Sequence, residues 1–213
     1  MKSLSVRILP LLCILAACHS PHWHLQTGDL IFLIPTGDSQ GSMDEAISAA
    51  TGEITHVAIV DVDESGGVSV IDATPRRGVS RYSLDTFISD NPLTEFVVKR
   101  LRDTSGVSRF VGNARGFIGE AYDMAFMPDN GAMYCSELVR EAYRTEDGSY
   151  LFDAPPMNFK DKDGHMPAFW EQSFERLGVS VPQGIPGTNP QDMSLSPLLE
   201  TVETGLPGRP TLR

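Results

Sequence analysis

The chain has 213 residues, of which 41% are hydrophobic and 21% are charged. This length suits one domain with a substantial core and is short for two. The formal net charge of −11, from 17 basic and 28 acidic residues, disfavours nucleic acid as a partner because a polyphosphate would be repelled. The apolar content is too high for a disordered chain, and no apolar run reaches the length of a membrane-spanning helix.

The first residues form a targeting segment. A basic start at Lys2 and Arg7 precedes an apolar stretch, residues 8–17, that is too short to cross a bilayer. The stretch ends in small residues followed directly by Cys18, an arrangement that resembles the lipobox of bacterial lipoproteins. The resemblance implies that residues 1–17 are a signal peptide and that Cys18 becomes the first mature residue and carries lipid. An ordinary cleaved signal peptide and an uncleaved anchor are the alternatives.

The segment after the signal peptide is expected to be a tether, residues 18–26. Its first residue after the cysteine is His19 rather than Asp, which resembles the sorting signal of enteric-type lipoproteins kept at the outer membrane. We therefore expect an exported protein, lipid-anchored in the bacterial cell envelope at the periplasmic face of the outer membrane. His22 and His24 lack the further ligands that a metal site requires, so no metal is predicted.

The first half of the domain reads as an antiparallel sheet with short helices between strands. Alternating or continuous apolar residues predict strands over residues 30–34, 56–62, 68–72, 76–82 and 95–101. Residues 63–67 form the turn of a hairpin between the second and third strands. Helical turns are predicted over residues 42–50, with Ser42 and Glu45 as a capping box, and over 83–88, capped by Ser83.

The second half is expected to be mainly helical. An apolar stripe at helical spacing from Phe110 to Ala121 predicts a helix with Ser108 as its N-cap, although Gly119 favours an early end of the helix or a close contact. A second helix is predicted over 135–143, and weaker signals over 168–177 and after Asn189. Residues 204–213 read as a flexible tail, which leaves residues 27–203 as a single domain of the α+β class.

Cys135 is the candidate nucleophile. Once Cys13 is removed with the signal peptide and Cys18 is lipidated, it is the only free thiol. It lies at the predicted start of a helix, where free N–H groups and the helix dipole favour a thiolate and can stabilise an oxyanion. The alternative is a small core residue, since free cysteine is among the most buried residue types.

His56 and Asp72 are the candidate partners of this thiol. His56 opens one strand of the predicted hairpin, and an imidazole can act as general base to a thiol. His165 lies in a charged loop without apolar support and is the weaker candidate. Asp72 ends the return strand, where cross-strand neighbours lie about 5 Å apart, so it could orient His56 as in a triad. Separately, each residue is also compatible with an ordinary strand end.

Five short segments together resemble the YiiX-like proteins, which are permuted papain-like cysteine amidases of the NlpC-type superfamily. The segments are TGDLIF at residues 27–32, THVAIV at 55–60, VIDA at 70–73, GEAYD at 119–123 and YCSELV at 134–139. They occur in the family's order, with the histidine strand before the cysteine helix. The resemblance implies a circularly permuted papain-like fold, in which a partly barrel-like antiparallel sheet packs against helices.

The resemblance also implies roles for individual residues. Cys135 is the nucleophile, His56 the base and Asp72 the orienting carboxylate, although the family is expected to have Glu, one methylene longer, at this last position. Tyr122 and Asp123 match the family's Tyr-Asp pair, so Tyr122 is a candidate to line the site or assist the oxyanion. Tyr134 is a further candidate for substrate binding. Glu137 matches the family's Cys-Ser-Glu stretch, and we expect it to cap the first helical turn.

The leading hypothesis is a cysteine hydrolase that cleaves an amide bond, in a cell-wall peptide or a related amide, through a Cys-His-Asp triad and a thioacyl-enzyme. No cofactor is needed for this chemistry. One alternative is a lipid acyl hydrolase or acyltransferase of the same superfamily, and another is a catalytically inactive envelope binding module. The expected partners are a peptide or amide substrate and the membrane that holds lipidated Cys18. The sequence does not predict an oligomeric state.

Overall fold

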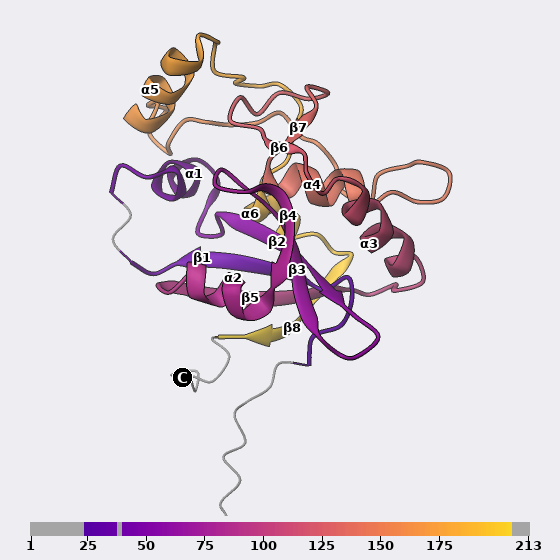
Figure 1. Ribbon diagram of the computed structural model, residues 1–213. Coiled ribbons are helices and arrows are strands. Elements are labelled where there is room, and N and C mark those ends of the chain that lie inside the picture. The colour runs from indigo at the N-terminus through magenta and orange to yellow at the C-terminus, as the bar shows by residue number, and fades with distance from the viewer. Residues whose placement is uncertain (1–23, 38–39, 206–213) are drawn as a thin grey trace, which may run out of the picture.

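The computed structural model describes residues 24–37 and 40–205. The predicted signal peptide, the lipidation site Cys18 and most of the tether lie outside the described residues, as do residues 206–213 of the predicted tail. Within the described part, a six-stranded antiparallel sheet forms the centre of the molecule (Figure 1).

The sheet has the strand order β4-β3-β2-β1-β5-β8, and every neighbouring pair is antiparallel. The sheet is open, with β4 and β8 at its edges, and is not closed into a barrel. The predicted antiparallel sheet is therefore confirmed. The strands are β1 (Leu30–Pro35), β2 (His56–Val62), β3 (Val68–Thr74), β4 (Gly78–Ser83), β5 (Thr94–Leu101) and β8 (Leu199–Thr204).

Both faces of the sheet are covered, which explains why β1 is apolar at almost every position. Leu30 and Phe32 pack on one face beneath α3 (Val107–Gly116) and α4 (Cys135–Ala142). Ile31 and Leu33 pack on the other face with Phe87 of α2 (Leu84–Asp90). Successive strand residues point to opposite faces, so the continuous apolar run supplies two cores at once.

A third core lies beyond the sheet and consists largely of aromatic rings. It joins α1 (Met43–Thr51) to α5 (Ala168–Leu177), and Figure 1 shows both helices at the same end of the molecule. Ring pairs contact each other edge to face, with centroids 5.2 Å apart for Phe159 and Trp170 and 5.4 Å apart for Phe126 and Trp170. The remaining elements are the two-residue strands β6 (Ala121–Tyr122) and β7 (Ala132–Met133), and α6 (Pro190–Ser194).

The predicted N-cap and the predicted end of one helix in the second half of the chain are wrong. The helix predicted from Phe110 to Ala121 begins at Val107, with Gly106 rather than Ser108 at its N-cap, and ends at Gly116. It ends early because Gly119 adopts a φ of +103° and donates its N–H to the carbonyl of Val79, 2.9 Å away. The chain thereby leaves the helix and runs along β4, where Ala121 enters β6. The edge strand β8 was not predicted at all.

The described residues at both ends of the predicted domain are hydrogen-bonded to the sheet. Gln26 donates its N–H to the carboxylate of Asp29 at 2.7 Å, and the carbonyl of His24 accepts from Arg100 at 3.2 Å. Thr204 is the last residue of β8, and the N–H of Gly205 bonds to the carbonyl of Phe96 at 2.9 Å.

Gly78 provides a test of how tightly β4 meets the segment that carries Tyr122. Gly78 and Gly66 both have positive φ, +64° and +85°. A Cβ at Gly78 would lie 2.3 Å from the carbonyl oxygen of Glu120, whereas one at Gly66 meets nothing within 4 Å. We expect Gly78→Ala to lower the free energy of unfolding by about 2 kcal/mol more than Gly66→Ala, measured by urea denaturation. Equal losses in the two variants would contradict this close contact.

Candidate active site

Cys135 is the first residue of α4 and is 5% exposed. The apolar side of the helix consists of Leu138, Val139 and Ala142. These side chains pack into the core between the helix and strands β2 and β3. This packing fixes the start of the helix at the end of the sheet where β2 begins. The N–H groups of a first helical turn have no acceptor within the helix, so those near Cys135 are available to a negatively charged oxygen.

His56 and Asp72 are hydrogen-bonded, with the imidazole Nε2 2.7 Å from the carboxylate Oδ1. The pairing of β2 with β3 puts Ile59 opposite Ile71, and the same register places Ala58 opposite Asp72. His56 is therefore the diagonal neighbour of Asp72 on the same face, rather than its direct partner. Although Asp is shorter than Glu by one methylene, Asp72 makes a full hydrogen bond to the ring.

The electrostatics of His56 favour its protonated form. Burial by itself lowers the pKa of this imidazole, but the Asp72 carboxylate and the Cys135 thiol group act in the opposite direction through charge and hydrogen bonding, and together they raise the pKa well above 6.5. The His56 side chain is 19% exposed and that of Asp72 is 1% exposed. An imidazole between a carboxylate and a thiol group is an arrangement that can pass a proton to or from the thiol.

Tyr82 is a partner of Asp72 that the sequence analysis missed. Its hydroxyl donates to the second carboxylate oxygen, Oδ2, at 2.6 Å. Burial, followed by the neighbouring Asp72 charge, raises the pKa of Tyr82 far above 10.0, so the phenol keeps its proton. The signal for this contact was the register of β3 and β4, which puts Val70 opposite Tyr82 and thus Asp72 on the same face two residues away.

Tyr122 lies in β6, close to both Cys135 and Asp72. Burial and then the neighbouring Cys135 and Asp72 charges raise its pKa well above 10.0. Its hydroxyl contacts the sulfur of Met43 at 3.7 Å. Asp123, the other half of the predicted Tyr-Asp pair, is 2% exposed and accepts the N–H groups of Ala125 and Met127, each at 2.7 Å. Asp123 therefore shapes the following loop.

Tyr134 and Glu137 lie on either side of Cys135 at the start of α4. The Tyr134 hydroxyl accepts the N–H of Thr188 at 3.0 Å, and burial raises the pKa of Tyr134 to about 12. Glu137 accepts the N–H of Tyr134 at 3.4 Å, as expected for a residue that caps the first turn. Burial and then the charges of Asp123 and Asp129 raise the pKa of Glu137 to about 7, against the lowering effect of the Tyr134 N–H and Arg140.

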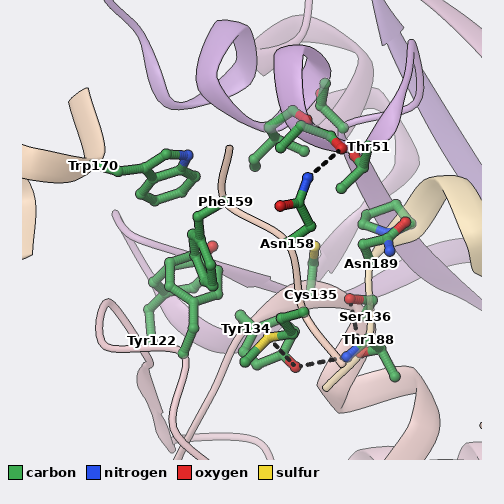
Figure 2. A pocket seen from close by; sticks show the side chains of 16 residues that line it. Thr51, Tyr122, Tyr134, Cys135, Ser136, Asn158, Phe159, Trp170, Thr188 and Asn189 are labelled. Atoms are coloured by element: carbon green, nitrogen blue, oxygen red, sulfur yellow. Dashed lines mark hydrogen bonds between the residues drawn. The ribbon is translucent and has the colours of Figure 1, made fainter. Parts of the chain in front are cut away.

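Two cavities meet at the pair formed by Cys135 and His56. The first has an empty volume of about 510 Å³ including open space, and Figure 2 shows the Cys135 side chain pointing into it, with Phe159 and Trp170 along one side. The second has about 1010 Å³ and is lined by charged residues beside His56, including Arg76, Arg77 and Asp90. Both cavities are lined by Ile47, Thr55 and Tyr122.

The two cavities differ in chemistry. The first is walled mainly by apolar and aromatic side chains: Ile47, Ala50, Phe126, Met157, Phe159 and Trp170. The sequence analysis did not identify this cavity, because its wall comes from α1, α5 and loops that are far apart in the chain. The second is lined by His56 and Asp72 together with charged side chains.

Comparison with known proteins identifies the family. The family model described as "permuted papain-like amidase enzyme, YaeF/YiiX, C92 family" matches residues 24–203. The chain belongs to this family. It is therefore a hydrolase of the cysteine amidase type, and the predicted resemblance is confirmed.

A solved structure supports the same fold. The crystal structure of the metalloprotein YiiX from Escherichia coli O157:H7 is 24% identical and superposes with a TM-score of 0.68, covering 87% of this chain and 100% of that one. Among curated proteins, no match was found.

Neither a metal cluster nor a membrane-spanning helix is evident in the described part of the chain. Over residues 24–37 and 40–205, no three or more His, Cys, Asp or Glu side chains are grouped so that they could hold a metal ion. In the same residues, no helix has the length and apolar character needed to cross a bilayer.

The raised pKa of Glu137 predicts a pH dependence of stability. A carboxyl group with a raised folded-state pKa contributes stability that is complete below 4.5 and lost as the pH rises through about 7. Relative to Glu137→Gln, which cannot titrate, the wild type should lose about 2 kcal/mol of unfolding free energy between pH 4 and pH 8, allowing for its partial exposure. Urea denaturation at both pH values measures this difference.

The control for this experiment is Glu53→Gln, which changes an exposed carboxylate outside the site. It should show no comparable pH-dependent difference. If the difference in unfolding free energy between Glu137→Gln and the wild type is the same at both pH values, the raised pKa of Glu137 is contradicted.

Proposed function

We propose that this amidase cleaves its substrate through a Cys135–His56–Asp72 triad. The observation that carries the proposal is the hydrogen bond between the buried Asp72 carboxylate and His56, whose imidazole is close enough to the thiol at the start of α4 for that thiol to raise its pKa. Asp72 binds Nε2, so the other ring nitrogen, Nδ1, is left to exchange a proton with Cys135. This is the division of labour that triad chemistry requires.

The proposed reaction has two halves. The Cys135 thiolate attacks the carbonyl carbon, and the oxyanion that forms is stabilised by the backbone N–H of Cys135 at the helix start. The tetrahedral intermediate collapses as the C–N bond breaks, and the His56 imidazolium gives its proton to the departing amine. In the second half, His56 takes a proton from water, the hydroxide adds to the thioacyl carbon, and Cys135 departs as thiolate, which releases the carboxylic acid.

The two cavities support a direction for the substrate. Because His56 must protonate the leaving group, the leaving amine belongs in the polar cavity beside His56. The acyl group then occupies the apolar cavity that the thiol points into. The substrate class that fits is an amide with an apolar acyl side and a polar or charged amine side.

A cell-wall peptide is the first candidate substrate, on the grounds of the proposed envelope location. The apolar cavity favours a second candidate, an acyl lipid whose ester or amide carbonyl reaches Cys135 while its chain fills the space among Phe159, Trp170 and Met157. The alternative of a non-catalytic binding module predicts an inert thiol and no turnover.

The test is a substrate panel for the full-length protein in detergent. Cell-wall peptides, N-acyl amino acids and phospholipids are incubated with the wild type, and new amines, acids and lysolipids are measured by mass spectrometry. We expect Cys135→Ala to reduce turnover about 1000-fold or more, and His56→Ala about 100-fold or more. Release of amine favours the amidase proposal, and release of lysolipid favours the acyl hydrolase.

His165→Ala is the matched control for His56→Ala, because the His165 side chain is 80% exposed and lies outside both cavities. This variant should keep wild-type turnover. Turnover that survives the loss of Cys135 would refute the triad.

We further propose that Cys18 is lipidated and anchors the enzyme in the cell envelope. The support is the apolar stretch ending in small residues directly before Cys18. In cells given labelled palmitate, Cys18→Ala should lose the label and move from the membrane fraction to the soluble fraction. Cys13→Ala, which changes the signal peptide without touching the acceptor, should keep the label. Equal labelling of the wild type and Cys18→Ala would disprove the anchor.

A further inference from the structure

We propose that Tyr82 is a positioning residue that holds Asp72 in the orientation from which it supports His56. The proposal rests on the triad proposed above and adds a residue that does not itself touch the thiol. Its basis is that the two oxygens of one buried carboxylate are divided between two donors: Oδ1 binds His56 at 2.7 Å and Oδ2 accepts from Tyr82 at 2.6 Å.

The sheet register places these three side chains together. Asp72 pairs with Ser80 and Val70 pairs with Tyr82, so Tyr82 is the diagonal neighbour of Asp72 on one side. His56 is its diagonal neighbour on the other side, from β2. Side chains two residues apart project from the same face of a sheet. The carboxylate on β3 is therefore held from both adjacent strands.

The ring of Tyr82 is itself fixed. The Arg77 guanidinium lies over it at 4.5 Å from the ring centroid, and Arg77 is ion-paired with Asp90 at 2.6 Å. The Phe87 ring lies on a further side, with centroids 6.4 Å apart. A hydroxyl on a ring held in this way donates in one direction, which restrains rotation of the Asp72 carboxylate about its side-chain bonds.

The burial of Asp72 implies that loss of the Tyr82 hydroxyl would weaken the support that Asp72 gives to His56. Asp72 is 1% exposed, so its oxygens depend on protein donors, and a buried carboxylate oxygen without a partner is costly. Removing the Tyr82 hydroxyl would leave Oδ2 in this condition. The carboxylate would then gain stability by turning away from His56 or by binding a proton, and either change weakens support for the imidazolium. The other titratable groups around this cluster are Cys135, Tyr122, Asp44, Arg76, Arg77 and Asp90.

The experiment measures how fast iodoacetamide alkylates Cys135 in the full-length protein between pH 5 and pH 9, with the Cys135 peptide quantified by mass spectrometry. Tyr82→Phe keeps the ring and its packing. We expect it to slow alkylation at pH 6 about tenfold, the effect of one hydrogen bond to a charged group, and to move the acid limb of the pH profile to higher pH. Tyr150→Phe is the matched control, because the Tyr150 hydroxyl also donates to a carboxylate, that of Glu141, but on the surface.

A double-mutant cycle with Asp72→Asn separates positioning from other effects. If Tyr82 acts through Asp72, Tyr82→Phe should cost nothing further once Asp72→Asn is present. A tenfold loss in both backgrounds would overturn the proposal, as would a Tyr82→Phe profile equal to the wild type. If Asp72→Asn does not fold, the alkylation pH profile of Tyr82→Phe alone tests the proposal. A variant that is only less stable has a lower melting temperature, but the acid limb of its pH profile stays in place.

The same assay distinguishes failure of this inference from failure of the triad. A wild-type thiol that reacts slowly and is indifferent to His56→Ala would overturn both. A reactive thiol that depends on His56 but ignores Tyr82→Phe would overturn only the role of Tyr82.

Discussion

The packing of α4 on the sheet is the contact on which the site depends. Leu138, Val139 and Ala142 bury the apolar side of the helix against β2 and β3. The residue that follows the helix, Tyr143, donates its hydroxyl to the carbonyl of Gly28 at 2.9 Å. With its far end tied to the start of β1, the helix cannot slide along the sheet. Its first residue, Cys135, is thereby held beside the first residue of β2, His56. Cys135 is therefore placed by the packing of apolar side chains three to seven residues further along the same helix.

Carboxylates around this helix behave differently because their surroundings differ. Asp72 has two partners, His56 and Tyr82, so both of its oxygens are hydrogen-bonded in a buried place. Asp123 uses its oxygens on two backbone N–H groups and shapes a loop. Glu137 has one long bond to Tyr134 and acidic neighbours, so burial dominates and its pKa rises to about 7. Residue type alone does not separate these roles, whereas the number and charge of the donors does.

Much of the candidate site was predictable because its residues lie at or near the ends of regular elements. The strand that begins at His56, the hairpin that returns through Asp72 and the helix that begins at Cys135 all follow from apolar patterns, turn residues and the family's motif order. The short edge strand β8 was not predictable, because three of its six residues, at 200, 201 and 204, are exposed and its pattern is polar. The end of α3 depends on a bond from Gly119 to Val79, a tertiary contact that no local pattern records.

The features that were not predicted from the sequence are formed by segments that lie far apart in the chain. Tyr82 reads as an ordinary alternating strand residue until the register of three strands is known, and only then does it face Asp72. The apolar cavity is similar, since Ile47, Phe126 and Trp170 come from three segments that meet at the Cys135 side of the sheet. In this fold the reactive atoms lie on strand and helix ends that local sequence predicts, while the walls that select a substrate come from tertiary packing. The candidate site residues can therefore be inferred from short motifs, and the substrate has to be inferred from the shape and polarity of the two cavities beside them.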